Sequence, residues 1–273
     1  MSRLTVVKIG GNVIDNSEKL HSFLRDFAAL DGFKILVHGG GKIATQLSDE
    51  LGIEAKLLEG RRITDIESLR IVTMVYAGLI NKNIVAQLQA VNCNAIGLSG
   101  ADGNLIRAVK RPVKITASGT AIDYGYVGDL DDRSVDSIQM KKLLEAGFIP
   151  VFSAITHDGE SQLLNTNADT IASVIAVAMS KLHETRLVYC FEKKGVLSDT
   201  NDEHSLVREI DPVKYASLKS DGIIYEGMIP KLDNAFSAIN DGVKEVFIGH
   251  SDELGQLAGG KFGTRLTISN TVY

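Results

Sequence analysis

The sequence predicts an α/β protein with a mostly parallel sheet, on three observations. Apolar runs rich in β-branched residues, at 3–9 and 33–38, each stop abruptly at glycines, as buried strands do. Between them, apolar residues recur at helical spacing over residues 20–30. The same alternation returns at 134–146 and 148–153. Strands alternating with helices are typical of a parallel sheet covered by helices.

The remaining elements follow from turn and cap signals. Ser17 is predicted to cap the first helix, and the capping box Thr64-Asp65-Ile66-Glu67 is predicted to open a long helix over 65–90. Residues 106–127 alternate and are punctuated by Pro and Gly, which favours antiparallel hairpins. We expect a surface loop at 199–205. Further helices are expected at 42–51, after Asn167 to about 182, from Asp211-Pro212, and from Gly227 to about 240, and further strands at 95–99, 186–191, 245–248 and 264–268.

Composition excludes several classes of protein. The chain has 273 residues, 44% hydrophobic and 23% charged, which is enough to bury a large core. A net charge of −5 offers no basic field for nucleic acid. Two distant cysteines, Cys93 and Cys190, indicate neither a disulfide framework nor a zinc site. The longest apolar run, 171–179, is too short to cross a bilayer, so we expect a soluble cytoplasmic protein without a membrane partner.

Two glycine turns predict an anion site. Lys8-Ile9-Gly10-Gly11 places a cation beside bare backbone, although an ordinary turn with a solvated lysine would read the same way. His38-Gly39-Gly40-Gly41 stands between a strand and a helix N-terminus, which favours negative charge. We interpret the anion as phosphate. His38 itself is interpreted as a packed or backbone-bonded histidine.

Two other phosphate-binding motifs have similar glycine patterns. Gly39-x-Gly41-x-x-Ala44 fits a loose dinucleotide fingerprint, but arginines crowd the acidic residue about twenty positions later. A nicotinamide or flavin oxidoreductase therefore stays open as a weaker alternative. A P-loop is excluded because Ile43 follows Lys42 and Leu36 stands where the first glycine belongs.

Further polar residues stand at strand-to-helix junctions. Arg62 can offer a bidentate fork to a carboxylate, with a surface arginine as the alternative. Asn165, Asn167 and Asp169 exceed what one helix cap requires, although capping explains at least one of them. Lys231 begins a helix, where a cation conflicts with the dipole unless an anion lies nearby.

In this order the motifs resemble the amino acid kinase family, over essentially the whole chain. Within the family the resemblance is greatest to arginine-insensitive members that act on N-acetylglutamate. The matching stretches are Lys8-Ile9-Gly10-Gly11, His38-Gly39-Gly40-Gly41, Gly60-x-Arg62-x-Thr64, Leu98-Ser99-Gly100-x-Asp102-Gly103, Asn165-x-Asn167-Ala168-Asp169 and Gly227-Met228-Ile229-Pro230-Lys231.

The resemblance implies a fold and two lobes that bind different substrates. The fold would be a three-layer α/β/α sandwich around an open, mainly parallel eight-stranded sheet. Residues 1–180 would form an N-terminal lobe that binds the acylated amino acid and dimerises, and residues 181–273 a C-terminal lobe that binds the nucleotide.

The resemblance also implies a role for each matching residue. Lys8 and Lys231 would stabilise the phosphoryl group in flight, and Asp169 would hold these lysines. The backbone of four glycines would contact that group, and Arg62 and Asn165 would bind the amino acid substrate. The glycines are Gly10, Gly11, Gly40 and Gly41; Gly40 and Gly41 would also line the substrate site.

The implied activity is ATP-dependent phosphorylation of the side-chain carboxylate of N-acetyl-L-glutamate, in arginine biosynthesis. Magnesium would arrive with ATP, because the sequence has no obvious carboxylate cage. An N-succinyl glutamate or an aminoadipate derivative stays open as substrate, and a catalytically silent sensor is a further alternative. Without an extra N-terminal helix before the first strand, we expect a homodimer insensitive to arginine.

One stretch departs from the family pattern. Where members have Thr/Ser-Asp-Val-x-Gly-Val, this chain reads Phe191-Glu192-Lys193-Lys194-Gly195-Val196. This puts nucleotide contacts at the stretch in question. Lys193 or Lys194 can face a phosphate there, with a solvated turn as the alternative.

Overall fold

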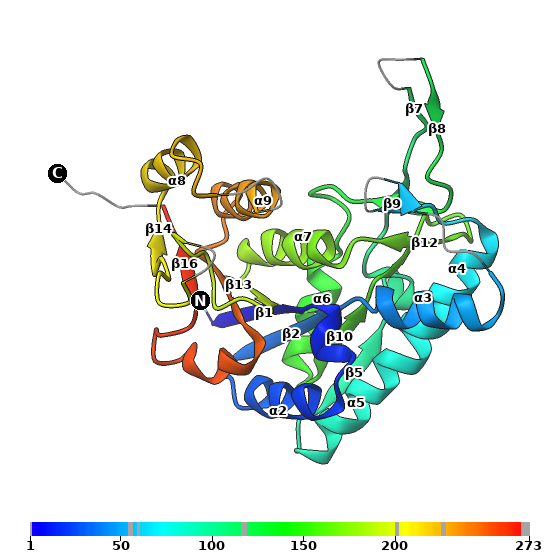
Figure 1. The fold of residues 1–273 in the computed structure, drawn as a ribbon. Coiled ribbons are helices and arrows are strands. Elements are labelled where there is room, and N and C mark those ends of the chain that lie inside the picture. Colours follow the sequence, from blue (N-terminus) through cyan, green and yellow to red (C-terminus); the bar gives the residue numbers. More distant parts are fainter. Residues whose placement is uncertain are drawn as a thin grey trace. The chain divides into compact units, whose positions relative to one another are not determined.

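The computed structural model describes residues 2–53, 57–58, 61–115, 119–199, 202–224 and 228–268, and only the backbone at 57, 58, 61, 62 and 230 (Figure 1). The chain forms two compact units: one from the described parts of residues 1–36 and 172–273, the other from those of 37–171. We call them the first and second unit. The predicted lobes, 1–180 and 181–273, were defined by which ligand each binds. That division stays a prediction.

The main sheet has eight strands in the order β14-β16-β15-β13-β1-β2-β10-β5. The pairs β1·β13, β13·β15, β14·β16 and β10·β5 are parallel, while β15·β16 is antiparallel. The predicted α/β class with a mainly parallel eight-stranded sheet is therefore confirmed. The strands are β1 (Arg3–Ile9), β2 (Phe33–His38), β5 (Ala95–Leu98), β10 (Ile149–Ser153), β13 (Glu184–Phe191), β14 (Glu209–Ile210), β15 (Glu245–His250) and β16 (Thr264–Leu266).

Central strands of this sheet are buried along their length. In β1 every residue from Leu4 to Ile9 is buried, and in β2 every residue from Lys34 to His38 is. A strand covered on both faces needs a continuous apolar run, which is why the β-branched stretches predicted these strands correctly. In the first unit, α9 (Ile229–Asn240) lies on one face of the sheet, and α2 (Ser17–Ala28) with η3 (Ser251–Gln256) on the other (Figure 1).

The second unit carries smaller sheets, of which the sequence predicted only the antiparallel hairpins at 106–127. One has four strands in the order β11-β12-β9-β6, and two hairpins pair β3 with β4 and β7 with β8. Their bounds are β3 (Leu57–Leu58), β4 (Arg61–Arg62), β6 (Val109–Lys110), β7 (Lys114–Ile115), β8 (Ala121–Ile122), β9 (Val127–Asp129), β11 (Ile155–His157) and β12 (Leu163–Thr166). Strands of two to four residues carry too little periodicity to be recognised singly. The remaining helices are α1 (Gly11–Ile14), α3 (Gly41–Glu50), α4 (Ile66–Val72), η1 (Thr73–Ile80), α5 (Asn81–Ala90), η2 (Asp102–Asn104), α6 (Ser137–Glu145), α7 (Ala168–Ser180) and α8 (Pro212–Ser220).

Two predicted caps were wrong by one residue. Asn16, not Ser17, caps α2, because its side-chain oxygen accepts from the N–H groups of Glu18 and Lys19. Asp65, not Thr64, caps α4 by accepting from the N–H of Ser68 at 2.9 Å. In both pairs the neighbouring residue is also a common N-cap, and the cap is the residue whose side chain reaches the N–H groups of the first turn.

The long helix predicted over 65–90 is confirmed, with one irregularity. Residues Ile66–Ala90 run as α4, η1 and α5, and η1 is a π-helix. This helix is long and apolar enough to cross a membrane by length and composition, yet 44% of its most apolar window is buried within the fold. It packs against β5, β10 and α3, as a core helix does.

Candidate active site

The first glycine turn ends strand β1 in the first unit. Lys8 is the penultimate residue of that strand and only 9% exposed, so the solvated-lysine alternative does not describe it. The N–H of Gly10 donates to the carbonyl of Cys190 at 3.3 Å and is therefore already engaged in the sheet. Gly11 begins α1, where first-turn N–H groups have no acceptor within the helix. Of the two glycines, Gly11 is the better candidate for a backbone donor to phosphate.

Lys8 and Lys231 approach the same aromatic ring. The Lys231 Nζ lies 4.0 Å from the centroid of the Phe191 ring, and the Lys8 Nζ lies 5.1 Å from it. Lys8 comes from the end of β1, Lys231 from the first turn of α9 and Phe191 from the end of β13. The sequence singled out both lysines but gave Phe191 no role. Its only signal was that it replaces a hydroxyl residue of the family pattern.

The stretch after Phe191 turns sharply at Gly195. At this residue φ is +150°, and an added Cβ would lie 2.5 Å from the Thr264 Oγ1. The same Oγ1 accepts from the N–H of Val196 at 2.8 Å and donates to the carbonyl of Val207 at 2.7 Å. Only glycine fits here, so the Gly-Val end of the family pattern is structurally required although the residues before it differ.

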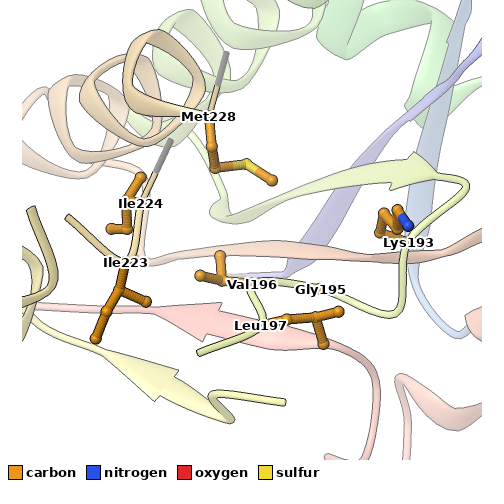
Figure 2. Close-up of a pocket in the computed structure, with 7 residues that line it drawn as sticks. All are labelled: Lys193, Gly195, Val196, Leu197, Ile223, Ile224 and Met228. Carbon is orange, nitrogen blue, oxygen red and sulfur yellow. The ribbon is translucent and has the colours of Figure 1, made fainter. Parts of the chain in front are cut away.

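A pocket lies beside this turn (Figure 2). Isoleucines 223 and 224 lie at one end and Lys193 at the other, with Met228, Val196 and Leu197 between them. An apolar slot with one cation at its rim suits a flat base attached to a charged group. Lys194 instead forms an ion pair with Glu203 at 2.9 Å, which raises the pKa of Lys194. Of the two lysines, Lys193 is therefore the one that lines the pocket.

In the second unit, His38 anchors the triple glycine. The Asn81 Nδ2 donates to the His38 Nε2 at 3.0 Å and to the Val151 carbonyl at 2.9 Å. The His38 Nδ1 lies 2.9 Å from the Gly39 carbonyl. Because the amide nitrogen of Asn81 can only donate, we assign the His38 proton to Nδ1, which then donates to Gly39. His38 thus fixes the first peptide of the glycine turn and is backbone-bonded, as expected.

His38 is held neutral by its surroundings. Burial lowers its pKa to about 4, the hydrogen bond to Gly39 opposes that shift, and the charge of Lys82 adds to it. Asn81 was missed from the sequence. The one available signal was helical spacing, since Asn81 precedes the apolar Ile84 and Leu88 by three and seven residues.

The turn needs glycine at position 40. Gly40 has φ +151°, and an added Cβ would meet the Ile80 Cδ1 at 2.2 Å and the Tyr76 Cδ1 at 3.1 Å. Both neighbours belong to the π-helix η1, a conformation frequent at functional sites. Gly41 then starts α3, and its N–H lies among the first-turn donors that favour an anion.

Asn165 is fixed by a residue first interpreted as a cap. Its Nδ2 donates to the Thr64 Oγ1 at 3.0 Å, and Thr64 is fully buried. The N–H of Thr64 donates to the Tyr124 carbonyl, and the Thr64 carbonyl accepts from the N–H of Tyr126. Thr64 therefore orients Asn165 instead of capping a helix.

The remaining residues of this junction divide between capping and other roles. Asn167 caps α7, because its Oδ1 accepts from the N–H groups of Asp169 and Thr170. Asp169 lies half-buried in the first turn of that helix.

Arg62 lies in β4, which pairs with β3, and its side chain lies outside the described part of the structure. All of Gly60 and Gly227 lies outside it as well. Among the residues described, no three His, Cys, Asp or Glu side chains cluster as metal ligands do.

The fold and these turns match known proteins. The model of the amino acid kinase family matches residues 3–250. The chain is 55% identical to an acetylglutamate kinase of Cytophaga hutchinsonii over 94% of this chain and 95% of that one. It is 50% identical to an acetylglutamate kinase of Parabacteroides distasonis over 97% and 100% of the two chains. A structure of carbamate kinase from Giardia lamblia bound to AMP-PNP has the same fold, with a TM-score of 0.66, 15% identity and coverage of 97% and 98%.

The chain belongs to the amino acid kinase family. The predicted resemblance is confirmed, since relatives at 50–55% identity carry the name acetylglutamate kinase. The insensitivity to arginine stays a prediction. The dinucleotide-binding alternative receives no support from these relatives.

Replacing Gly40 by Ala tests the close packing of the turn on η1. Strain at positive φ and the contacts with Ile80 and Tyr76 should lower the free energy of unfolding by about 1–3 kcal/mol. Gly78→Ala is the matched control, because nothing lies within 4 Å of its added Cβ and helix propensity favours alanine by about 1 kcal/mol. Urea denaturation measures both; equal midpoints for the two variants would contradict the packing described.

The neutral state of His38 gives a pH dependence of stability. With a folded pKa of about 4 against about 6.5 unfolded, the unfolded chain binds the extra proton first as pH falls. The His38 contribution is therefore complete above pH 6.5 and declines below it, by up to about 1.4 kcal/mol per pH unit, until about pH 4. Denaturation at pH 7, 6 and 5 should show a steeper decline in the wild type than in His38→Gln. The exposed His21, changed to Gln, should retain the wild-type slope, and a His38→Gln slope equal to it would refute the assignment.

Proposed function

We propose that this protein transfers the γ-phosphoryl group of ATP to the side-chain carboxylate of N-acetyl-L-glutamate, in arginine biosynthesis. The observation that carries the proposal is identity of 50–55% to acetylglutamate kinases over nearly the full length of both chains. The products are ADP and an acyl phosphate, N-acetyl-L-glutamyl 5-phosphate.

The reacting groups explain which side chains the reaction needs. The attacking carboxylate is already ionised, with a reference pKa of about 4.3, so no general base is required. Positioning and charge neutralisation remain, because phosphoryl transfer develops charge on the transferred oxygens. Lys8 and Lys231 are the catalytic residues that neutralise this charge, and the convergence of both on Phe191 supports that role. Asp169 orients the two lysines, a role that rests on the family resemblance.

The acylated amino acid binds to residues of the second unit. Gly40 and Gly41 offer backbone donors at the start of α3, and Asn165 offers an amide that Thr64 holds in place. Arg62 binds the α-carboxylate as a bidentate partner. The glycine conformation at position 40 supports a close approach of ligand to backbone there.

ATP binds in the first unit. The apolar pocket of Val196, Leu197, Ile224 and Met228 suits the base. Gly10 and Gly11 contact the phosphates, and Gly11 is the better donor because the N–H of Gly10 already bonds to Cys190. Magnesium enters on the phosphates of ATP and neutralises part of their charge when bound.

We further propose a cytoplasmic homodimer without arginine feedback. The helix at 66–90 supports the assembly, because Met74 and Leu79 are 53% and 56% exposed although both are large and apolar. A second copy of the same helix would bury them, as in a self-complementary twofold interface.

The activity is tested with an ATP-dependent hydroxamate assay on N-acetylglutamate, N-succinylglutamate, N-acetylaminoadipate and free glutamate. We expect the acyl phosphate chiefly from N-acetylglutamate. Lys8→Ala and Lys231→Ala should each lower kcat by about 10²–10³-fold with little change in KM, since both act on the transition state. Lys219→Ala removes a lysine that also lies over an aromatic ring, Tyr215, and should keep the wild-type kcat.

Arg62→Ala should chiefly raise the KM for the amino acid, with Arg61→Ala as its neighbour control. If none of the four substrates yields an acyl phosphate, the kinase proposal is wrong. Near-full turnover of Lys8→Ala would instead show that the roles are wrongly assigned.

Light scattering tests the assembly. We expect a particle of twice the 29.4 kDa chain mass. Leu79→Glu should dissociate it, because a charge would be buried in the interface, whereas Val213→Glu on the exposed face of α8 should not. A wild-type monomer, or a hexamer whose activity arginine inhibits, would overturn this part of the proposal.

A further inference from the structure

Two ammonium groups approach the ring of Phe191 at the end of β13. A benzene ring carries negative charge on its face and attracts a cation within about 6 Å of its centroid. The Nζ atoms of Lys231 and Lys8 both satisfy this limit, at 4.0 Å and 5.1 Å.

The ring is held firmly by the sheet. Phe191 ends β13, which pairs with β1 on one side and β15 on the other. Its ring stacks on that of Tyr189, with centroids 6.0 Å apart and planes inclined by 18°. Since β13 is a central strand, the ring is a fixed surface on which longer side chains can settle.

The two lysines differ in how much they need that surface. Lys8 is nearly buried on a rigid strand, so its stem is already confined. Lys231 is half-buried in the first turn of α9, where the helix dipole opposes a cation. Both ammonium groups approach the same ring, and like charges repel. A compensating attraction is therefore most useful to Lys231, which makes the closer contact.

We propose that Phe191 is a positioning residue that holds Lys231, and less strongly Lys8, ready for the transferring phosphoryl group through cation–π contacts. The inference rests on the proposed function, because it concerns the use of these lysines in phosphoryl transfer. Phe191 touches no reacting atom in this account; it limits where the two ammonium groups lie before ATP arrives.

Leucine removes the ring face but keeps an apolar side chain. Phe191→Leu should lower kcat about tenfold, the loss expected from weakened contacts of this strength, with KM for ATP within about twofold. Phe191→Tyr keeps the face and should stay within about twofold of the wild-type kcat. Phe236→Leu is the matched control, because the same change is made on α9, where the ring contacts Tyr215 and not the two lysines. It should leave kcat unchanged.

Two further measurements separate positioning from packing. Replacing Phe191 by phenylalanines with one, three and five ring fluorines keeps the shape while the attraction for cations weakens stepwise. The logarithm of kcat should then fall in step with the number of fluorines. In a Lys231→Ala background, Phe191→Leu should cost little more, since only the weaker contact with Lys8 remains to be lost.

A flat fluorine series, or a full additional loss from Phe191→Leu in the Lys231→Ala background, would overturn the inference. The fluorine series also decides the matter if the leucine variant does not fold. A wild type without kinase activity would be a failure of the proposed function instead. If the wild type is active and Lys231→Ala lowers kcat strongly, but kcat does not change along the fluorine series, only the role of Phe191 is refuted.

Discussion

The parallel pairing of β1 with β13 is the constraint on which the first unit depends. Its register sets Lys8 opposite Tyr189 and Ile9 opposite Cys190, so the chain leaves β1 beside the last residues of β13. Both strands are buried nearly throughout, and a slip of one residue would turn every side chain to the other face of the sheet. The position of the Lys8 ammonium is thus set by the burial of apolar neighbours and not by a flexible loop.

The second unit solves a similar problem with hydrogen bonds. The triple glycine has no side chains to fix it, and glycine is the residue with the most backbone freedom to lose. Packing on Tyr76 and Ile80 limits Gly40, and the contact from His38 limits Gly39. Asn81 completes the network by holding His38 and the Val151 carbonyl together. This glycine turn is therefore fixed by residues distant in sequence.

The sequence predicted what depends on local pattern. Buried strands and the glycines that end them were visible as β-branched runs at 3–9 and 33–38, and the helix at 66–90 as a long apolar repeat. The caps at Asn16 and Asp65 were missed by one position, because neighbouring residues can make the same bond. Contacts between residues distant in sequence could not be predicted from the sequence. Asn81 meets His38 across 43 residues, and the gathering of Lys8, Phe191 and Lys231 exists only once the strands are ordered.

The π-helix at Thr73–Ile80 makes the second unit sensitive to chain length as well as to composition. An α-helix turns by about 100° per residue, so one residue added or removed here rotates everything that follows by that angle. Asn81 is the next residue after η1, and a rotation of that size would carry its amide away from His38. A single insertion or deletion within this segment would therefore loosen the glycine turn some forty residues upstream.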